Sequence, residues 1–410
     1  MKTKNKNIKM SSDSSSDASY VPTSDVDYYS DDSDLVHDAE GVSEEEIVPD
    51  GEEDPEGFRF VIPFDKKTPD VRHDDLPVFT KPDAGITRAM PSFGSPVEAF
   101  KVLMDYEVCT HIMQSSNERA AFYLQTNQVR RVYGLVWKNI SMDEFNVFIG
   151  LVLLAGIVRL PRIHMYWGDH VCWGGPKIFC GPVMSRNRFN TIMKFLRFTK
   201  IDEVIPGSPT TRVGSFLALL RQKCQAALHI GQHMAIDESL MLYKGRLHFK
   251  QFIRTKRARF GIKIFFICPG HPDWQGYSWD FDVYYGSGSE YTIPDDPQTP
   301  AGCPKGSDLT KSEAVVVFLM ERSNLLDIHS HVILDNWYSS LRLATYLEYR
   351  KTQMTGIVRA DRGIPHDLKK KDFHLPHKSS AFMRRKNVLA VRFEDRKTFY
   401  SLTTRYVQYW

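Results

Sequence analysis

Apolar residues recur at intervals of three and four between residues 97 and 230, which is the spacing of helices that bury one face. In the first such segment the pattern is carried by Phe100, Leu103, Met104, Val108, Ile112 and Met113. Further on, Ser141 stands three residues before Glu144, which predicts a capping box at the start of a second helix. The apolar run Val147–Val158 follows, and its 12 residues are too few for a membrane span of about 20, so we expect a buried helix.

A third amphipathic segment, residues 184–198, is basic. Its apolar side is expected to pack inward through Phe189, Ile192, Met193 and Leu196. Its cations are available for phosphate contacts, although a solvated helix face is the expected role of at least two of them; they are Arg186, Arg188, Lys194 and Arg197. Residues 97–230 are therefore predicted to form a helical N-terminal region.

The pattern changes after residue 230 to segments rich in β-branched and aromatic residues and bounded by Gly and Pro, which is typical of strands. Three successive strands are predicted, namely HMAIDESLML, FGIKIFFICP and YSWDFDVYYG. The helix KSEAVVVFLMERSNLL, the strand HVILDNWYSS, the helix LRLATYLEYRK and the strand QMTGIVRA follow. Three strands, helix, strand, helix, strand is the chain order of a ribonuclease H-like α/β domain. We therefore predict a mixed five-stranded sheet with helices over residues 231–364.

Residues 1–60 are rich in Ser, Asp and Glu and poor in apolar groups, so burial cannot offset the entropy cost of ordering them. We expect a disordered acidic tail, followed by a proline-punctuated linker over residues 61–96. Ser14, Ser24 and Ser43 each lie three residues before an acid, a spacing that suits acid-directed kinases. The tail is thus a candidate for phosphorylation or for binding basic proteins, and a merely solvated tail is an equal alternative.

Charge is divided unevenly along the chain. Residues 1–58 hold 17 Asp or Glu and 4 Lys, a net charge of −13, so residues 59–410 must carry +16 to reach the total of +3. A strongly basic body favours nucleic acid over a membrane surface as partner. The six cysteines show no C-x-x-C pair and no regular spacing, so we expect reduced thiols and no zinc site.

Two acids occupy matching places in the predicted sheet, Asp237 on its first strand and Asp335 at the end of its fourth. If these strands are neighbours, the two side chains converge. Adjacent carboxylates repel each other unless a cation bridges them, and oxygen ligands on a rigid sheet favour Mg²⁺ or Mn²⁺ over zinc. Two such ions support in-line phosphoryl displacement. The alternative for each residue is the ordinary one, a turn or cap aspartate at a strand end.

Residues 239–263, named here the basic track, contain eight Lys or Arg and no acid. These are the candidate DNA-binding residues, and they are Lys244, Arg246, Lys250, Arg254, Lys256, Arg257, Arg259 and Lys263. They are expected to hold a DNA backbone beside Asp237 with a salt-sensitive affinity. A solvated loop or a nuclear import signal is the alternative.

Several blocks resemble, in order and spacing, the core of piggyBac-type transposases and their domesticated descendants. These blocks are IDESLMLYKGRLHFKQFIRTKRARFGIKIFFIC, DFDVYYGSG, LDNWYSS and TGIVRADRGIP, preceded by MDEFNVFIGLVLLAGIVRLPRIHMYWGDH and MSRNRFNTIMKFLRFTK. The resemblance covers residues 97–408. It implies that Asp237 and Asp335 are the first two acids of a metal-binding Asp-Asp-Asp triad. It also implies Mg²⁺-dependent cut-and-paste DNA transposition through hairpin ends at TTAA sites, by a dimer in the nucleus.

The family's third acid lies downstream, on a helix entered through a Gly-Gly-Val-Asp segment. Residues 365–410 resemble the start of the β-rich insertion that precedes this helix, and neither that segment nor the family's Cys-rich tail occurs before Trp410. The acids that remain as substitutes are Asp361, Asp372, Glu394 and Asp395. Only Asp361 is topologically close, and the neighbouring Arg359 and Arg362 suggest a surface salt bridge for it.

The leading hypothesis is a piggyBac-derived DNA-binding protein with an incomplete triad. One alternative is a fragment of an active DNA transposase, and another is a non-enzymatic chromatin or protein-interaction module that uses the acidic tail. A glycosidase acting through Asp237 and Glu238 is excluded, because adjacent residues on a strand point to opposite faces and cannot flank one bond.

Overall fold

The computed structural model describes residues 57–60, 78–87, 94–126, 137–168, 179, 183–204, 209–254, 259–286, 291–370 and 372–405. Every described residue belongs to one compact unit, Pro49–Trp410. The expected tail up to residue 56, most of the linker, Lys256 and Arg257 lie outside the described residues. Within the described part, no helix has the length and apolar character needed to cross a membrane.

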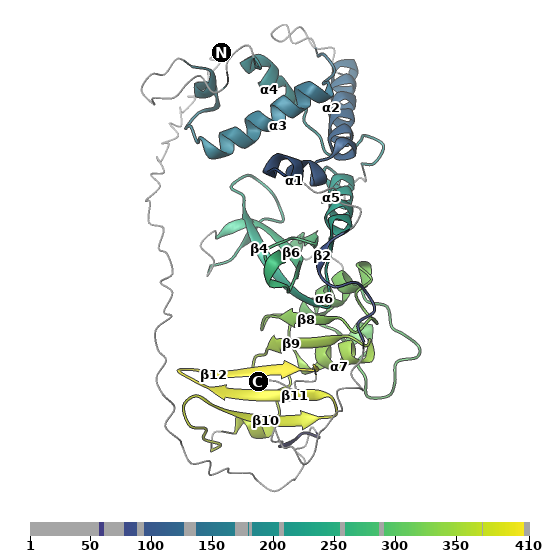
Figure 1. The fold of residues 1–410 in the computed structure, drawn as a ribbon, viewed down its shortest axis with the longest axis vertical. Helices are drawn as coiled ribbons and strands as arrows, with labels where there is room; N and C mark the ends of the chain where they lie inside the picture. Colours follow the sequence, from purple (N-terminus) through teal and green to yellow (C-terminus); the bar gives the residue numbers. More distant parts are fainter. Residues whose placement is uncertain are drawn as a thin grey trace, which may run out of the picture. The chain divides into compact units, whose positions relative to one another are not determined.

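The described residues between 96 and 227 form mainly helices, as predicted (Figure 1). The helices are α1 (Pro96–Leu103), α2 (Tyr106–Thr126), α3 (Met142–Ile157), α4 (Arg186–Phe195) and α5 (Gly214–Ala227), with a 3-10 turn, η2 (Ile163–Trp167). The Ser141 hydroxyl caps α3 by accepting a hydrogen bond from the Glu144 backbone N–H at 3.3 Å. Only this half of the predicted capping box is seen, because the Glu144 carboxylate binds the Arg188 guanidinium at 2.6 Å instead.

Helix α3 is not buried all round, contrary to the expectation for its apolar run. Phe145, Phe148 and Leu151 are buried, whereas Leu153 is 51% and Ile157 79% exposed. The buried face packs against α2 and α4, where the rings of Phe148 and Phe189 lie 5.1 Å apart. Apolar character alone could not say which face would find a partner.

Two of the four cations predicted for residues 184–198 have structural roles. Arg188 binds Glu144 and lies 5.1 Å from the centre of the Trp137 ring, and the Lys194 ammonium lies 5.2 Å from the Tyr123 ring. Phe189 and Ile192 are buried as expected, but Met193 is 45% exposed, so its predicted inward direction is wrong.

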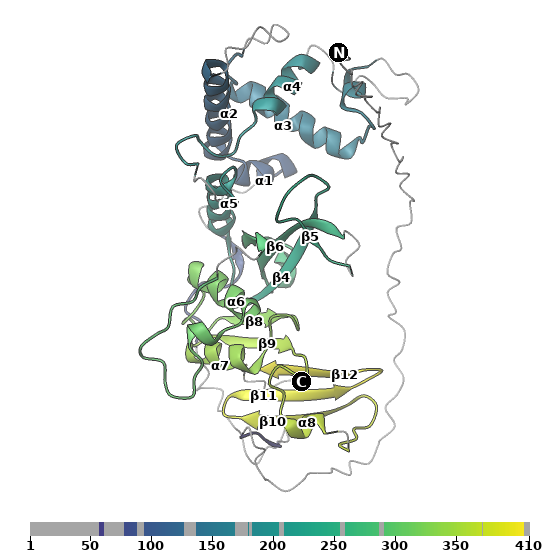
Figure 2. The ribbon, with the colours of Figure 1, turned by 180° about the vertical axis from the view of Figure 1, so that it is seen from behind.

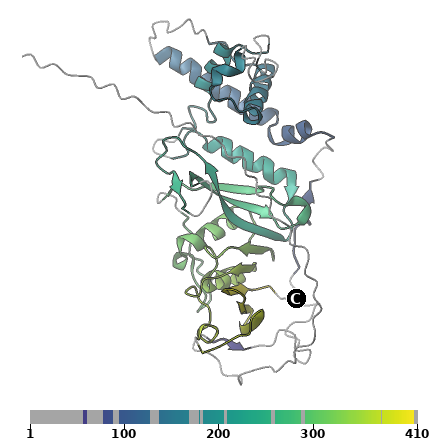
Figure 3. The ribbon, with the colours of Figure 1, turned by 90° about the vertical axis from the view of Figure 1, so that its left-hand side faces the viewer.

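The predicted order of three strands, helix, strand, helix and strand is confirmed after residue 230. The elements are β4 (His233–Leu242), β6 (Phe260–Pro269), β7 (Asp280–Val283), α6 (Lys311–Arg322), β8 (His331–Leu334), α7 (Leu341–Tyr349) and β9 (Gln353–Ile357). The fourth strand is shorter than predicted, because the chain turns at Asp335, where the Tyr338 N–H donates to the Asp335 carbonyl at 3.1 Å. Helix α5 packs against β7 and is the teal helix beside these strands in Figure 3.

These strands belong to one mixed sheet of ten strands. Its order is β1-β10-β11-β12-β9-β8-β4-β6-β5, and β7 pairs with β6. Strands β4, β8 and β9 are parallel to one another, and β6 is antiparallel to β4. The added strands are β1 (Arg59–Phe60), β5 (Gln251–Phe252), β10 (Ser379–Arg385), β11 (Val388–Glu394) and β12 (Thr398–Thr403).

The sheet crosses two of the predicted boundaries. Strand β12 pairs with β9, so residues 379–403 extend the sheet of residues 231–364. Strand β1 pairs with β10, and Phe58 is fully buried, so the last residues assigned to the acidic tail are part of the fold. The remaining short elements are β2 (Gly85–Ile86), which pairs with β3 (Leu228–His229), η4 (Pro272–Trp274), η6 (Gly306–Asp308) and α8 (His366–Lys369).

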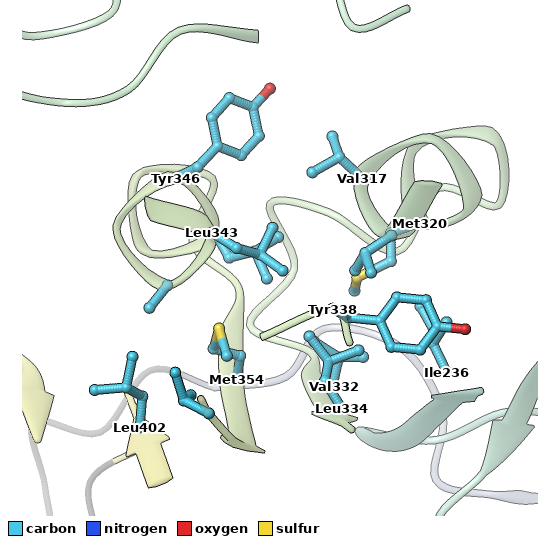
Figure 4. Close-up of a cluster of buried hydrophobic side chains, with 14 of the residues drawn as sticks. Ile236, Val317, Met320, Val332, Leu334, Tyr338, Leu343, Tyr346, Met354 and Leu402 are labelled. Carbon is cyan, nitrogen blue, oxygen red and sulfur yellow. The ribbon is translucent and has the colours of Figure 1, made fainter. Parts of the chain in front are cut away.

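Helices α6 and α7 cover one face of the sheet (Figure 4). The side chains that meet there include Val317 and Met320 of α6, Leu343 and Tyr346 of α7, Val332 and Leu334 of β8, and Met354 of β9. Each large apolar side chain buried in this way contributes about 1.5–3 kcal/mol. The four described cysteines, Cys109, Cys224, Cys268 and Cys303, are free thiols, as predicted for this part of the chain.

We expect the two faces of β9 to respond differently to truncation. Met354 is fully buried and Ile357 is 47% exposed. Met354→Ala should lower the free energy of unfolding by about 2–5 kcal/mol, because it leaves a cavity under α7. The matched variant Ile357→Ala should cost well under half of that. Urea unfolding followed by circular dichroism measures both, and equal losses would contradict the assignment of the covered face.

Candidate functional site

Asp237 and Asp335 follow the last residue pair that joins two neighbouring parallel strands. Ile236 of β4 pairs with Leu334 of β8, Asp237 is the next residue of β4, and Asp335 comes directly after β8 ends. Ile236 and Leu334 are buried and both aspartates are exposed. Because side chains alternate along a strand, both carboxylates point away from α6 and α7, onto the opposite face of the sheet. Neighbouring strands are about 4.8 Å apart, so the two acids are adjacent.

Local contacts hold each aspartate in place. One carboxylate oxygen of Asp237 accepts a hydrogen bond from the Glu238 N–H at 2.8 Å. The Asp335 carbonyl accepts from the Ser339 hydroxyl at 3.0 Å and from the Ser339 N–H at 3.2 Å. On β6, burial and the nearby Asp237 charge raise the pKa of the Cys268 thiol, which keeps it protonated. The Asp237 carboxylate is therefore held by a hydrogen bond, and the backbone of Asp335 is held by the turn that follows it.

A glycine permits the turn after Asp335. A Cβ on Gly356 of β9 would overlap the Ser339 hydroxyl and would lie 2.8 Å from the Leu334 carbonyl oxygen. Because the turn is in contact with β9 at this point, the position of Asp335 depends on the absence of a side chain at residue 356.

Glu238 belongs to the covered face, as strand alternation predicts. Its carboxylate accepts a hydrogen bond from the Tyr338 hydroxyl at 2.8 Å and lies 3.8 Å from the Lys263 ammonium. Burial first, and then the Glu238 charge, raise the pKa of Tyr338 far above its usual range, so this hydroxyl stays a donor. The contact ties the residue after Asp237 to the turn after Asp335. Asp237 and Glu238 do not face one another, which agrees with the exclusion of a glycosidase.

Sequence reasoning missed the roles of Tyr338 and Lys263. The sequence pattern groups Lys263 with the candidate DNA-binding residues. In the structure its ammonium lies 4.1 Å from the Trp337 ring centre and 4.7 Å from the Phe265 ring centre. Its side chain is only 13% exposed, so it is a packing and ion-pair residue. The sequence contains a signal for these roles. Glu238 shares a strand face with the apolar Ile236 and Leu240, and an acid on a mostly buried face needs a hydrogen-bond donor or a cation as partner.

The other described residues of the basic track are more open. Lys244, Arg246, Arg254 and Arg259 are exposed. Lys250 is half-buried, and its ammonium donates to the Gly245 carbonyl at 3.2 Å. The predicted cations are therefore grouped at the end of β4, around β5 and at the start of β6.

The candidate third acids do not join the pair. Arg362, next to Asp361, donates to the carbonyls of Trp337 at 2.6 Å and Ser339 at 3.4 Å, and the expected salt bridge with Asp361 is not found among the described residues. Glu394 binds Arg392 at 3.1 Å, and Asp395 lies 3.7 Å from His377. In the part of the chain that the structure describes, no three His, Cys, Asp or Glu side chains are grouped as metal ligands.

Comparisons with known proteins agree with this architecture. Residues 95–408, more than half of the chain, match the family model described as Transposase IS4. PiggyBac transposable element-derived protein 3 of Homo sapiens is 26% identical over 291 residues, which are 68% of this chain and 43% of that protein. The chain belongs to the piggyBac-type transposase family.

Two further relatives show how far the piggyBac-type similarity extends. PiggyBac transposable element-derived protein 2 of Homo sapiens is 25% identical over 272 residues, 65% of this chain and 40% of that protein. A cryo-EM structure of a piggyBac transposase synaptic complex with hairpin DNA matches with a TM-score of 0.61 at 23% identity, covering 79% of this chain and 64% of that one. The fold is thus shared, and this chain spans less than half the length of the curated relatives it matches.

Adding one methyl group at Gly356 tests the packing behind Asp335. We expect Gly356→Ala to lower the free energy of unfolding by about 1–3 kcal/mol, because the turn and β9 must move apart. The control is Gly150→Ala in α3, where a Cβ meets no atom within 4 Å. That change should be neutral or stabilising by up to about 1 kcal/mol through helix propensity. Chemical denaturation measures both, and an unchanged Gly356→Ala protein would refute the close packing of this turn.

Proposed function

We propose that this chain binds double-stranded DNA over a ribonuclease H-like sheet and holds Mg²⁺ or Mn²⁺ between Asp237 and Asp335. The observation that supports the proposal is the register of β4 and β8, in which Ile236 pairs with Leu334 and Asp237 and Asp335 are the residues that follow. The sheet order β7-β6-β4-β8-β9, in which β6 alone runs antiparallel to the other four strands, supports a ribonuclease H-like core. Both crossover helices, α6 and α7, pack on the face of the sheet that carries Ile236 and Leu334 (Figure 4).

The donor set fits a hard divalent cation. Two exposed carboxylates, one on β4 and one directly after the neighbouring β8, offer the oxygen ligands that Mg²⁺ and Mn²⁺ favour. A bound ion of this type supplies charge neutralisation at a phosphoryl group. Asp237 and Asp335 would bind it, while Glu238 and Tyr338 keep the two strands aligned from the covered face.

Strand cleavage by the described residues is proposed to be weak. In-line phosphoryl transfer with two metal ions needs more than one pair of carboxylates. One ion must be held beside the attacking oxygen and the other beside the leaving oxygen of the reacting phosphate. The described residues supply that pair and no third acid grouped with it.

The basic track supports the DNA part of the proposal. Residues 59–410 carry +16, and exposed arginines follow the strand that bears Asp237. The matched structure of similar fold is a transposase bound to hairpin DNA. Nuclear residence and a homodimeric assembly belong to the same proposal, as does phosphorylation of the acidic tail or its binding to basic proteins.

A fragment of an active transposase is the second candidate. The share of each curated relative that is matched, 43% and 40%, favours it. Sequencing the transcript past the codon for Trp410 separates the candidates, because an open frame with a further acid in a Gly-Gly-Val-Asp segment would complete the triad. A strand-transfer assay with Mg²⁺ on a matched transposon end tests the chain as given, and robust integration would refute weak cleavage.

Removal of either acid is expected to abolish the response to metal. Saturating Mn²⁺ should raise the Tm of the wild-type chain by several degrees, because binding to the folded state alone adds about 2.7 kcal/mol at 100 times Kd. Asp237→Asn and Asp335→Asn should each lose this rise, and should show no drop in metal-free Tm since like-charge repulsion is relieved.

Asp361→Asn is the matched control and is expected to keep the full rise. Electron paramagnetic resonance of Mn²⁺ counts the bound ions directly. An unchanged Mn²⁺ response in Asp237→Asn would place the metal elsewhere, and loss of the response in Asp361→Asn would identify Asp361 as a ligand.

The basic track is expected to set the salt dependence of DNA binding. The triple variant Arg246→Gln, Arg254→Gln, Arg259→Gln should weaken duplex binding. The slope of log K against log salt should become less negative by up to about 2.7, at about 0.9 per lost phosphate contact. The control Lys386→Gln, Arg396→Gln, Lys397→Gln removes the same charge from exposed positions near the β10, β11 and β12 hairpins. Fluorescence anisotropy measures both, and equal effects would show that net charge alone drives binding.

A further inference from the structure

Strands β5 and β6 lie at the end of the sheet that carries the basic track (Figure 2). Each carries an exposed phenylalanine. Phe252 of β5 pairs with Phe260 of β6, and their ring centres are 4.7 Å apart at an angle of 39°. Phe252 is 56% and Phe260 49% exposed. Large apolar side chains that are exposed as a pair mark a site of interaction more often than isolated ones do.

The backbone holds this pair in a fixed position. The Ile253 N–H donates to the Arg259 carbonyl at 2.9 Å, and the Tyr243 N–H donates to the Phe260 carbonyl at 3.3 Å. A Cβ on Gly261 would overlap the Met241 carbonyl, so β4, β5 and β6 converge closely beside the rings. The rings therefore form a preformed surface, which reduces the entropy cost of binding.

The rings lie on the same face of the sheet as the acid pair. Asp237 pairs with Phe266 of β6, and Phe260 lies six residues, an even number, from Phe266 along that strand. Alternation therefore puts Asp237, Phe260 and Phe252 on one face. At about 3.3 Å per residue, the rings are about 20 Å from the carboxylates.

The charge around the rings identifies the partner. The Lys250 ammonium lies 5.7 Å from the Phe260 ring centre, and the exposed Lys244, Arg246, Arg254 and Arg259 lie close to Phe252 and Phe260 along the chain. No acid occurs between residues 239 and 263. Cations that follow a phosphate backbone, combined with aromatic rings that stack on bases, are the features of surfaces that bind unpaired nucleotides. In an intact duplex the base faces are covered by their neighbours, so the rings gain a partner only where stacking is interrupted.

We propose that Phe252 and Phe260 stack on bases exposed at a gap or break in DNA, and that they make the protein prefer interrupted duplexes over intact ones. The inference rests on the proposed function, since the basic track must hold the phosphates. It adds a specificity that cations alone do not give, because phosphate contacts are the same in both kinds of DNA.

The test compares an intact duplex with the same duplex carrying a short single-stranded gap, by anisotropy on the full chain without divalent metal. Wild-type protein should bind the gapped duplex more tightly. Phe252→Leu with Phe260→Leu should reduce gapped-duplex affinity by about five-fold to about a hundred-fold, the loss of one stacked base, and should change intact-duplex affinity less than about two-fold. A 2-aminopurine base in the gap should be quenched by the wild-type protein and not by this variant.

Two controls separate stacking from other effects. Phe252→Tyr with Phe260→Tyr keeps both rings and should keep the preference. Phe393 and Phe399 face each other across β11 and β12 and are 38% and 44% exposed, so Phe393→Leu with Phe399→Leu is the matched pair and should have no effect.

The possible failures are distinguishable. Equal binding of gapped and intact DNA by the wild type would overturn the stacking proposal and leave the DNA-binding function intact. Absence of binding to either DNA would overturn the proposed function. A change in oligomeric state of the Leu variant by size-exclusion chromatography, with DNA preference unchanged, would show that a second copy of the chain covers the rings and would also overturn the proposal.

Discussion

The parallel pairing of β4 and β8 is the constraint on which the candidate site depends. The pairs run from His233 with His331 to Ile236 with Leu334, and the burial of Ile236 and Leu334 under α6 and α7 sets the direction of the next residue on each strand. A slip of one residue would turn one carboxylate into the apolar core. Two carboxylates repel each other, so no attraction between the acids brings Asp237 and Asp335 together. Their approach results from the packing of the covered face.

Polar contacts hold the two strands at both ends. At the start of the strands, the Nδ1 atoms of His233 and His331 lie 3.1 Å apart beside the Arg405 guanidinium. Burial and the Arg405 charge lower the pKa of His331 to about 3, so this ring stays neutral within the sheet. At the other end, Glu238 and Tyr338 join β4 to the turn after β8. Polar contacts on each side of the apolar pairs therefore stabilise the register of β4 and β8.

The two faces of the sheet have different chemistry. One is covered by α6 and α7 and contains the large apolar cluster, while the other carries the acid pair, Phe252 and Phe260. The arginines of the basic track lie at the edge where this open face ends. Carboxylates and aromatic rings on one face, with cations at its edge, provide groups for metal, base and phosphate. This grouping links the metal and DNA parts of the proposed function to the stacking surface.

The sequence by itself determined the order of helices and strands, the places of Asp237 and Asp335, and the opposite directions of Asp237 and Glu238, because each follows from periodicity within a short segment. Only the tertiary structure decided which side chains would meet across long separations. It paired Glu144 with Arg188, enclosed Lys263 among aromatic rings, left part of α3 exposed and extended the sheet through β12. A cation or an apolar face looks the same in sequence whether or not a partner exists, because that partner lies on another element and is set by packing.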